Sequence, residues 1–307
     1  MPETPLETEV LIVGAGPAGL TAATYLGRFR RRVLVADGGA PRACWIPESH
    51  NTPGFPEGVG GEALLARMRD QAGRYGAETR TGRIETLART DDGFTGVFAD
   101  GARVTARAVL LATGVVDRHP PLPGCDDAIQ RSLVRICPIC DAYEATDKAI
   151  AVIGDSELGA RECAFLRTYS DRVTLIHIGG ATDLRQRQAL ADLGVEIIDA
   201  PIDGVEIADD RITAVSWGGQ ARTFDVLYSA LGTDPNVKLA TQLGAERGED
   251  GTLVVSAHLE TSVPGLYAAG DVVLGLNQIA VATSEAAIAA TDIHNRLARA
   301  DGQRLPA

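Results

Sequence analysis

The stretch of residues 9–39, EVLIVGAGPAGLTAATYLGRFRRRVLVADGG, decides the fold of this chain. It opens with an apolar run typical of a buried strand, passes through a glycine-rich turn and continues with small and apolar residues at helical spacing. A second β-type run, 33–35, closes the stretch. Strand, helix and strand in this order predict a βαβ unit, whose two strands lie parallel in one sheet.

The turn of this unit has the spacing of a dinucleotide-binding loop, Gly14-Ala15-Gly16-Pro17-Ala18-Gly19. Gly14 suits the tight turn, Gly16 lets the backbone approach a pyrophosphate, and Gly19 allows close packing of the helix on the sheet. The start of the helix attracts the phosphate charge. Asp37, at the end of the next strand, stands where the acceptor for a ribose hydroxyl is expected.

Residues 149–179 repeat the same pattern, which predicts a second βαβ unit. Two apolar runs, 150–153 and 173–176, flank a turn that reads Gly154-Asp155-Ser156-Glu157-Leu158-Gly159. Residues 200–231 alternate short β-type runs with turn residues, so we expect short strands there. Two βαβ units in a chain of 307 residues predict an α/β fold with two Rossmann-like, three-layer dinucleotide-binding domains.

The charge balance limits the classes of partner. Lysine and arginine together number 29 against 41 aspartates and glutamates, a net charge of −12. Such a surface argues against nucleic acid or an anionic membrane as the main partner. The sequence starts without the basic and apolar regions of a signal peptide, and no apolar run is long enough to span a bilayer, so we expect a cytoplasmic protein.

One close pair stands out among the five cysteines, Cys137-Pro138-Ile139-Cys140, and Asp141 follows it. A Cys-x-x-Cys at the start of a helix can form a short-range disulfide, and the helix dipole favours one thiolate. We interpret the pair as redox-active. A structural zinc site needs four ligands, and the sequence has no second Cys-x-x-Cys, so no metal is expected. Inert buried cysteines are the other alternative.

Two further strand-and-turn segments, 109–114 and 265–271, contain Ala-Thr-Gly and Ala-Gly-Asp. Together with the first turn and the cysteine pair, they resemble the low-molecular-weight thioredoxin reductases, a family of flavoprotein disulfide oxidoreductases. The resemblance implies that FAD is bound and that the second dinucleotide domain is inserted into the first. By this resemblance the FAD-binding domain spans 1–118 and 246–307, and the inserted NAD(P)-like domain, which carries the cysteines, spans 119–245.

The same resemblance assigns roles to individual residues. Beyond the first turn, the implied FAD-binding residues are Asp37, Asn51, Thr113, Gly114, Gly270, Asp271, Gln278 and Ile279. Cys140 would face the flavin, Cys137 would exchange with the partner disulfide, and Asp141 would act as a general acid or base. A plain helix-capping role for Asp141 is the alternative. The family is usually homodimeric, so a homodimer is implied.

The second turn departs from the family pattern. Ser156 stands where the middle glycine is expected, and Asp155 and Glu157 add negative charge beside the place of a pyrophosphate. After the next strand the family has His-Arg-Arg, whereas this chain has His177-Ile178-Gly179. The two arginines that would grip a 2′-phosphate are therefore absent. We predict that this protein does not use NADP(H) efficiently.

Relatives with a degraded NADPH motif indicate what could replace this nucleotide. The resemblance extends to diflavin-linked disulfide oxidoreductases, which hold a second FAD, to ferredoxin-dependent flavin thioredoxin reductases, and to dithiol oxidases that pass electrons to oxygen. The thiol partner would be a thioredoxin-like protein or a small dithiol or disulfide. Two alternatives stay open: an NADPH-dependent thioredoxin reductase in which Arg185 or Arg187 grips the phosphate, and a flavin-binding redox sensor without turnover.

Overall fold

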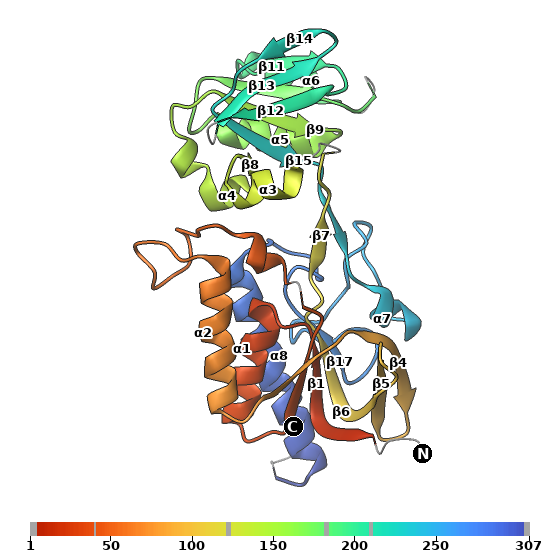
Figure 1. Cartoon of the computed structure of the whole chain (residues 1–307). Coiled ribbons are helices and arrows are strands. Elements are labelled where there is room, and N and C mark those ends of the chain that lie inside the picture. The colour runs from red at the N-terminus through yellow and green to blue at the C-terminus, as the bar shows by residue number, and fades with distance from the viewer. Residues whose placement is uncertain (1–4, 40, 121–123, 181–183, 209–210, 304–307) are drawn as a thin grey trace. The chain divides into compact units, whose positions relative to one another are not determined.

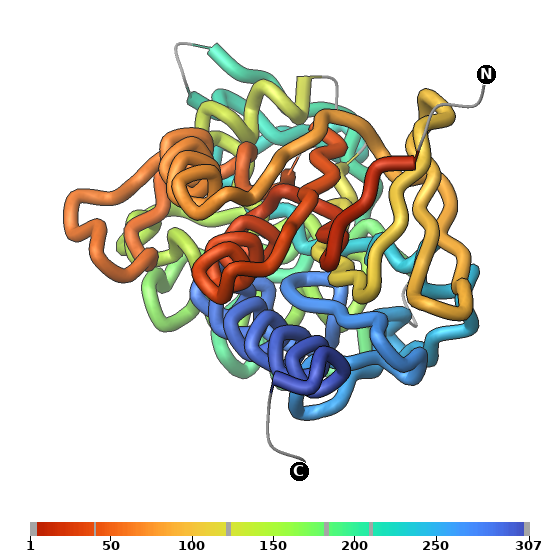
Figure 2. The backbone as a smooth tube through the Cα atoms, turned by 90° about the horizontal axis from the view of Figure 1, so that it is seen from below, coloured from red at the N-terminus to blue at the C-terminus, as the bar shows by residue number. Residues whose placement is uncertain are grey.

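The chain forms two compact units in a computed structural model that describes residues 5–39, 41–120, 124–180, 184–208 and 211–303 (Figure 1; Figure 2). Unit 1 comprises Met1–Ile46, Thr52–Val116 and Pro235–Ala307, whereas unit 2 comprises Pro47–Asn51 and Asp117–Asp234. Most of unit 2 is therefore an insertion in the sequence of unit 1. The outermost residues of the expected FAD-binding domain, 1–4 and 304–307, lie outside the described residues.

Unit 1 is built on a seven-stranded sheet with the order β3-β2-β1-β6-β5-β4, and β17 pairs with β6. Its strands are β1 (Leu6–Val13), β2 (Val33–Asp37), β3 (Glu78–Thr81), β4 (Ile84–Thr90), β5 (Gly93–Phe98), β6 (Arg103–Leu111) and β17 (Leu266–Ala268). β1 pairs in parallel with both β2 and β6, whereas β5 pairs antiparallel with both β4 and β6. The first predicted βαβ unit is confirmed, with its two strands side by side.

Three helices of unit 1, α1 (Pro17–Arg28), α2 (Gly61–Arg74) and α8 (Ile279–Ala300), lie side by side against this sheet (Figure 1; Figure 2). Small residues let α1 pack closely on its neighbours. Leu20 and Ala23 are fully buried, and a Cβ at Gly27 would lie 2.7 Å from the Tyr75 carbonyl oxygen. Two shorter helices of this unit are η1 (Arg42–Trp45) and α7 (Lys238–Gln242).

The C-terminal segment completes unit 1. β17 adds a strand to the sheet beside β6, and α8 packs against α1. Just after α8, Asp301 Oδ2 lies 2.8 Å from Arg31 Nη1, and the same nitrogen lies 2.7 Å from Glu9 Oε1. The Arg31 side chain is only 7% exposed, so this cluster joins the end of the chain to β1 through largely buried ion pairs.

Unit 2 is built on a five-stranded parallel sheet with the order β11-β10-β9-β15-β8. Its strands are β8 (Val134–Arg135), β9 (Ile150–Gly154), β10 (Val173–His177), β11 (Glu196–Asp199) and β15 (Val226–Ala230). Its helices are α3 (Cys125–Gln130), α4 (Pro138–Asp141), η2 (Tyr143–Ala145), α5 (Glu157–Leu166) and α6 (Arg187–Asp192). The second predicted βαβ unit is thus confirmed as β9, α5 and β10.

A small antiparallel sheet follows in unit 2. Its strands are β12 (Gly204–Ala208), β13 (Arg211–Trp217) and β14 (Gln220–Arg222). Together with β15, these strands confirm the expectation of short strands and turns over residues 200–231. The α/β fold with two Rossmann-like domains is likewise confirmed.

The chain passes between the units through β7 (Val115–Asp117) and β16 (Thr233–Pro235), which pair with each other. We expected the inserted domain to run from 119 to 245, but the contacts of residues 235–245 place them in unit 1. The reason is the packing of α7 against β4, where Gln242 Oε1 accepts a hydrogen bond of 3.2 Å from the Leu87 N–H. Residues 121–123, near the expected start of the inserted domain, lie outside the described residues.

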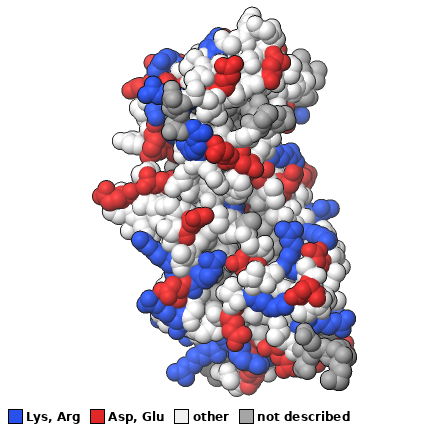
Figure 3. All heavy atoms as spheres, in the orientation of Figure 1, with Lys and Arg blue, Asp and Glu red and all other residues white. Residues whose placement is uncertain are grey.

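The surface carries charges of both signs. On the face drawn in Figure 3, lysine and arginine side chains are interspersed with aspartate and glutamate rather than gathered into one basic patch. Within the described part of the chain, no helix is both long and apolar enough to cross a bilayer.

Candidate active site

The first glycine-rich turn connects β1 to α1 and lies tightly against the sheet. A Cβ at Gly14, whose φ is +115°, would lie 2.1 Å from the Ala112 carbonyl oxygen, and a Cβ at Gly19 would lie 1.9 Å from the Gly14 oxygen. Only glycine fits at these two positions. At Gly16, in contrast, the nearest atom to such a Cβ is Pro41 Cβ at 3.8 Å, so the backbone there is open to a ligand.

The start of α1 offers its backbone N–H groups to an anion. Gly16 is the N-cap, Pro17 begins the helix, no side chain caps it, and its first turn holds no acidic residue. These features suit a pyrophosphate. Asp37 accepts hydrogen bonds from the Gly39 N–H at 2.9 Å and from Arg69 Nη2 at 3.0 Å. Its carboxylate is thereby fixed at the end of the strand beside β1, where a ribose acceptor is expected.

The turn at Gly270 lies at the starts of two helices. A Cβ at Gly270 would be 3.1 Å from Ala18 Cβ on α1 and 3.6 Å from Ala282 Cβ on α8. Gln278 is the N-cap of α8 and Ile279 is its first residue, and this helix also begins without a side-chain cap or an acidic first turn. The expected residues of the C-terminal segment therefore lie next to the expected residues of the first turn.

Polar contacts within unit 1 fix the remaining expected residues. Asp271 Oδ2 lies 3.1 Å from Arg42 Nη1. Thr113 Oγ1 donates to the Asn236 carbonyl at 2.8 Å, Asn236 Nδ2 donates back to the Thr113 carbonyl at 2.9 Å, and the Gly114 carbonyl accepts from the Asn236 N–H at 3.0 Å. The Thr113-Gly114 turn is therefore held by a segment that follows β16.

Asn51 groups with unit 2, unlike the other expected FAD-binding residues. Its Nδ2 donates to the Ile139 carbonyl oxygen at 3.3 Å. Ile139 lies between the two cysteines, so Asn51 contacts the segment that carries the redox pair.

Cys137 and Cys140 form a disulfide, and their Cα atoms lie 5.3 Å apart. Cys137 is the N-cap of α4, Pro138 is the first helical residue, and the Cys140 N–H donates to the Cys137 carbonyl at 3.0 Å. α4 consists of a single turn, however, so few peptide dipoles add up at its start. The effect of the helix dipole on a thiolate is therefore smaller than the sequence led us to expect.

Asp141 ends α4, and its side chain is held from outside the helix. Its Oδ1 accepts a hydrogen bond of 2.7 Å from the Tyr228 hydroxyl and lies 3.7 Å from Arg135 Nη1. Burial raises the pKa of Asp141 to about 6, against the lowering effects of the Arg135 charge and the Tyr228 hydrogen bond. Near neutral pH this carboxyl group can both accept and release a proton, which a residue that only caps a helix does not need.

The other cysteines offer poor nucleophiles. Cys125 and Cys163 are buried and Cys44 is half-buried, and burial raises the pKa of all three thiols. No group of three or more His, Cys, Asp and Glu side chains that could hold a metal ion occurs in the described ranges. The pair on α4 is therefore the candidate site for sulfur chemistry.

The second glycine-rich turn keeps the packing of the first but not its open backbone. A Cβ at Gly154 would lie 2.9 Å from Gly159 Cα, so the strand and helix approach each other closely there too. Ser156 takes the place of Gly16 as the N-cap, with extended backbone angles that any residue can adopt. Glu157 puts a carboxylate into the first turn of α5. Both changes disfavour a bound pyrophosphate.

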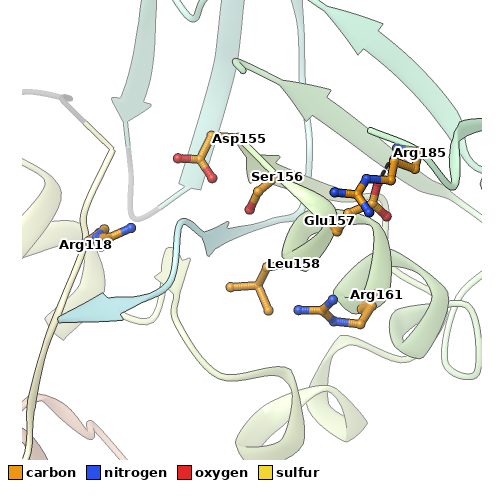
Figure 4. Close-up of a pocket in the computed structure, with 7 residues that line it drawn as sticks. All are labelled: Arg118, Asp155, Ser156, Glu157, Leu158, Arg161 and Arg185. Carbon is orange, nitrogen blue, oxygen red and sulfur yellow. Dashed lines mark hydrogen bonds between the residues drawn. The ribbon is translucent and has the colours of Figure 1, made fainter. Parts of the chain in front are cut away.

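Two nearby segments, around residues 179 and 185, contact this turn directly. Glu157 Oε1 accepts hydrogen bonds from the backbone N–H groups of Arg185 and Gln186, the first of which is drawn in Figure 4. A Cβ at Gly179 would lie 2.2 Å from the Asp155 carbonyl oxygen. The loop after β10 therefore packs directly on the turn, and a side chain at position 179 would require one of them to move.

A pocket of about 540 Å³ borders the second turn, and both arginines and acidic residues line it (Figure 4). Its arginines are Arg118, Arg161 and Arg185. Arg118 already pairs with Asp234, since Nε lies 3.1 Å from both carboxylate oxygens. Arg118 is thus already engaged by a carboxylate, and Arg161 and Arg185 supply the rest of the basic lining.

Arg187, one of the two arginines considered as a phosphate ligand, lies outside this pocket. It forms two hydrogen bonds with Asp199, from Nη1 to Oδ2 at 2.7 Å and from Nη2 to Oδ1 at 2.5 Å. This bidentate pair engages the guanidinium at the end of β11. Arg187 would therefore have to leave Asp199 to grip a phosphate.

Comparison with known proteins decides the family. Residues 8–286 match the family described as pyridine nucleotide-disulphide oxidoreductase. The chain belongs to this family. A thioredoxin reductase of Mycolicibacterium smegmatis is 32% identical to this oxidoreductase over 278 residues, which cover 86% of the chain and 88% of the relative.

Solved structures agree with this assignment. HlmI superimposes with a TM-score of 0.89 at 30% identity, covering 96% of this oxidoreductase and 94% of HlmI. A thioredoxin reductase of Streptococcus pyogenes gives a TM-score of 0.88 at 26% identity, covering 96% and 100%. This oxidoreductase is thus a thioredoxin reductase-like flavoprotein, an FAD-dependent enzyme that acts on sulfur groups.

The residues of unit 1 fit the FAD that this family implies. We call the turns 14–19, 113–114 and 270–279, together with Asp37, the flavin cradle. It combines two uncapped helix starts, an open backbone at Gly16 and a carboxylate at a strand end. These are the groups that a pyrophosphate and a ribose require. Pro17, Ala18 and the two glycines around them would line the phosphate side.

Four residues of the site escaped prediction from the sequence. They are Arg42, Glu285, Tyr228 and Arg135. Glu285 Oε2 accepts the Gly270 N–H at 2.7 Å, and burial raises the pKa of this carboxyl group. Arg42 forms an ion pair with Asp271, so it too contacts a cradle residue that is distant in sequence. Only Arg135 had a local signal, since it stands two residues before Cys137.

Proposed function

We propose that this oxidoreductase exchanges electrons between FAD and a thiol or disulfide partner through Cys137 and Cys140, and that NADPH is not its efficient electron donor. When bound, FAD supplies a two-electron donor or acceptor for the cysteine pair. The residues proposed to hold it are those of the flavin cradle, with Asn51 beside the cysteines. Similarity to thioredoxin reductases supports a thioredoxin-like protein as the partner.

The chemistry proposed for unit 2 is thiol–disulfide exchange. One partner thiolate attacks the Cys137–Cys140 bond, which breaks as a mixed disulfide forms at Cys137. A second partner thiol then displaces Cys137, so that the partner leaves as a disulfide and the pair gains two electrons and two protons. The Asp141 carboxyl group holds or releases the proton of the adjacent thiol. The reverse sequence reduces a partner disulfide, and the relative potentials decide the direction.

The closed second turn carries the proposal about NADPH. Glu157 occupies the first turn of α5, and Gly179 lies against the Asp155 carbonyl, where the family pattern has an arginine. A nucleotide carrying a 2′-phosphate would meet the Glu157 carboxylate at the helix start and no guanidinium at positions 178 and 179. Either a different electron partner, such as ferredoxin, oxygen or a second flavin, or a dithiol substrate would then exchange electrons with FAD.

The test is an anaerobic titration of the FAD-loaded enzyme with NADPH, followed by flavin absorbance. We expect no rapid bleaching at micromolar NADPH, whereas dithionite bleaches the flavin completely. Rapid stoichiometric bleaching by NADPH would overturn the proposal and favour an NADPH-dependent thioredoxin reductase.

A second experiment tests the role of the cysteines. Cys137→Ser and Cys140→Ser should each abolish electron transfer between the flavin and a thioredoxin-like protein or dithiol. Normal turnover in either variant would contradict the proposal. A wild-type enzyme that reduces and reoxidises its pair without any turnover would instead point to a redox sensor.

A further inference from the structure

Two buried side chains from the sheet of unit 2 hold Asp141 in place. Tyr228 is fully buried, and its hydroxyl donates to Asp141 Oδ1 at 2.7 Å. Arg135 donates from Nη1 to the Asp141 backbone carbonyl at 2.6 Å, and the same nitrogen lies 3.7 Å from Oδ1. One residue fixes the carboxyl group and the other fixes the backbone that carries it.

The sheet explains why these two side chains act together. β8 and β15 are parallel neighbours, and their register pairs Tyr228 with Arg135. Paired residues on adjacent strands project from the same face of a sheet. The Arg135 guanidinium lies 6.0 Å from the centre of the Tyr228 ring, and its Nη1 is 3.4 Å from the Tyr228 hydroxyl. Both residues are thus anchored to β strands rather than to the single-turn helix α4.

We propose that Tyr228 and Arg135 are positioning residues that orient the Asp141 carboxyl group and set the protonation state in which it meets the cysteine pair. This inference rests on the proposed function, because it assigns Asp141 a proton-transfer role in thiol–disulfide exchange.

The charges around Asp141 act in opposite directions. Burial and the nearby Glu144 on η2 raise its pKa, whereas Arg135 on β8 and the Tyr228 hydrogen bond from β15 lower it. α5 also packs against α4, and it carries Glu162, whose pKa burial raises to about 8, and Arg161. Glu162 is therefore mostly uncharged at neutral pH and adds little repulsion to the Asp141 carboxylate.

Tyr228 is suited to hold the carboxylate form of Asp141. Burial raises the pKa of the Tyr228 hydroxyl above its ordinary value, so it stays protonated and remains a donor. A donor to an ionised carboxylate favours ionisation, and so does a neighbouring guanidinium. Asp141 can then take the proton of a thiol as that thiol becomes a thiolate, and return it when the disulfide forms again.

The experiment uses the full-length, FAD-loaded enzyme with its cysteine pair reduced. The alkylation rate of the pair by iodoacetamide is measured from pH 5 to pH 9, with turnover over the same range. The apparent pKa that is absent in Asp141→Asn is assigned to Asp141. Tyr228→Phe should move it upward by about half to one pH unit, because one hydrogen bond to the carboxylate is lost. Arg135→Met should move it further in the same direction, and Arg135→Lys should restore part of the shift.

Tyr267 supplies a matched control in unit 1. It is also fully buried, and its hydroxyl donates to Asp292 Oδ2 at 2.6 Å. Tyr267→Phe therefore removes an equivalent hydrogen bond from the unit that does not carry the cysteine pair, and should leave the pH profile unchanged.

The possible outcomes separate this inference from the proposed function. An unshifted profile in folded Tyr228→Phe and Arg135→Met, or an equal loss of rate at every pH, overturns the positioning role. A profile that is the same in Asp141→Asn and wild type shows instead that Asp141 transfers no proton, which removes that part of the proposed function. If Tyr228→Phe fails to fold, as judged by circular dichroism, the Arg135→Lys and Arg135→Met profiles decide.

Discussion

The two glycine-rich turns of this oxidoreductase lie in the same βαβ architecture but differ in the residues around the start of the helix. Both keep the glycines at which the strand and the helix touch, Gly14 and Gly19 in one and Gly154 and Gly159 in the other. They differ at the middle position, where Gly16 is open and Ser156 is followed by a carboxylate. The outer glycines serve packing, more tightly in the first turn than in the second, whereas the middle residue matters chiefly to the ligand. The middle residue is therefore the position on which the proposed difference in nucleotide binding between the two turns depends.

The largest effect should come from exchanging the packing glycines for alanine. A Cβ at Gly19 would lie 1.9 Å from the Gly14 backbone oxygen, whereas a Cβ at Gly159 would lie 3.1 Å from its nearest neighbours. We expect Gly19→Ala to lower the free energy of unfolding by about 3 kcal/mol or more and to lose FAD. Gly159→Ala should change it by less than about 1 kcal/mol, because a helical alanine offsets the crowding. Urea unfolding and the flavin content of the purified variants measure both, and equal losses would show that the two turns do not differ in packing.

Exchanging the middle residues should affect the ligand rather than the fold. The atom nearest to a Cβ added at Gly16 is Pro41 Cβ, at 3.8 Å. Gly16→Ser should therefore fold normally. We expect its affinity for FAD to fall about 10- to 100-fold, or about 1.4–2.8 kcal/mol, measured by flavin fluorescence on dilution. Ser156→Gly should leave both stability and the response to NADPH unchanged, since Glu157 and the loop at Gly179 still close the second turn. Rapid bleaching by NADPH in Ser156→Gly would show that the serine alone blocks the site.

The two units should also respond differently to pH. The pKa of Asp141 in unit 2 is raised to about 6. Above pH 6 the ionised Asp141 therefore lowers the free energy of unfolding. This destabilisation disappears as the pH falls toward the pKa of an aspartate in the unfolded chain, near 4. Glu9 in unit 1 behaves in the opposite way. Burial alone would raise the pKa of Glu9, but hydrogen bonds from the Arg32 N–H and from Arg31 lower it. The ionised Glu9 therefore stabilises the fold above the pKa that it has in the unfolded chain. This stabilisation is lost as the pH falls through its pKa in the folded protein.

Asp141→Asn and Glu9→Gln test this difference in sign. Asp141→Asn should raise the free energy of unfolding by about 1–2 kcal/mol at pH 8 and have little effect near pH 4, although it slows turnover. Glu9→Gln should destabilise at pH 8 and progressively less below pH 4. Urea unfolding at three pH values measures both, and a stabilising effect of Asp141→Asn that grows on acidification would contradict the assigned pKa.

The smallest effect should come from the carboxylate that closes the second turn. Glu157 accepts from two backbone N–H groups, so Glu157→Ala should lower the stability of unit 2 by about 1 kcal/mol. Combined with Ser156→Gly, it should give slow but measurable bleaching by NADPH. Glu162→Ala, on the same helix, is the control, because it removes a glutamate without opening the turn. An unchanged response in the double variant would place the block at the Gly179 loop.

The sequence predicted those features that depend on local pattern. Both βαβ units, the short strands after residue 200 and the Cys137–Cys140 disulfide follow from runs of a few residues. Gly16 and Ser156 could be compared from the sequence because each occupies a fixed place between a strand and a helix. The absence of arginine at Gly179 could be seen in the same way.

Features that depend on tertiary contacts could not be predicted. The hydrogen bond from Tyr228 to Asp141 joins residues 87 positions apart, and in the sequence Tyr228 is simply an aromatic residue in a strand. The contact of Glu157 with the Arg185 N–H depends on how a loop returns to the first turn of α5. The grouping of residues 235–245 with unit 1 depends on the docking of α7 on β4, which leaves no pattern in the sequence.

The late position of β17 and α8 in the chain has a consequence for how the protein is made. Domains tend to fold as units while synthesis proceeds from the N-terminus. The main segment of unit 2 is complete once residue 234 has left the ribosome, whereas unit 1 still lacks β17, the Gly270 turn and the Asp301 ion pair with Arg31. Most of the disulfide-bearing unit can therefore fold before the flavin cradle is complete. A nascent chain would thus complete most of the unit that carries the cysteine pair before α8 completes the proposed site for FAD.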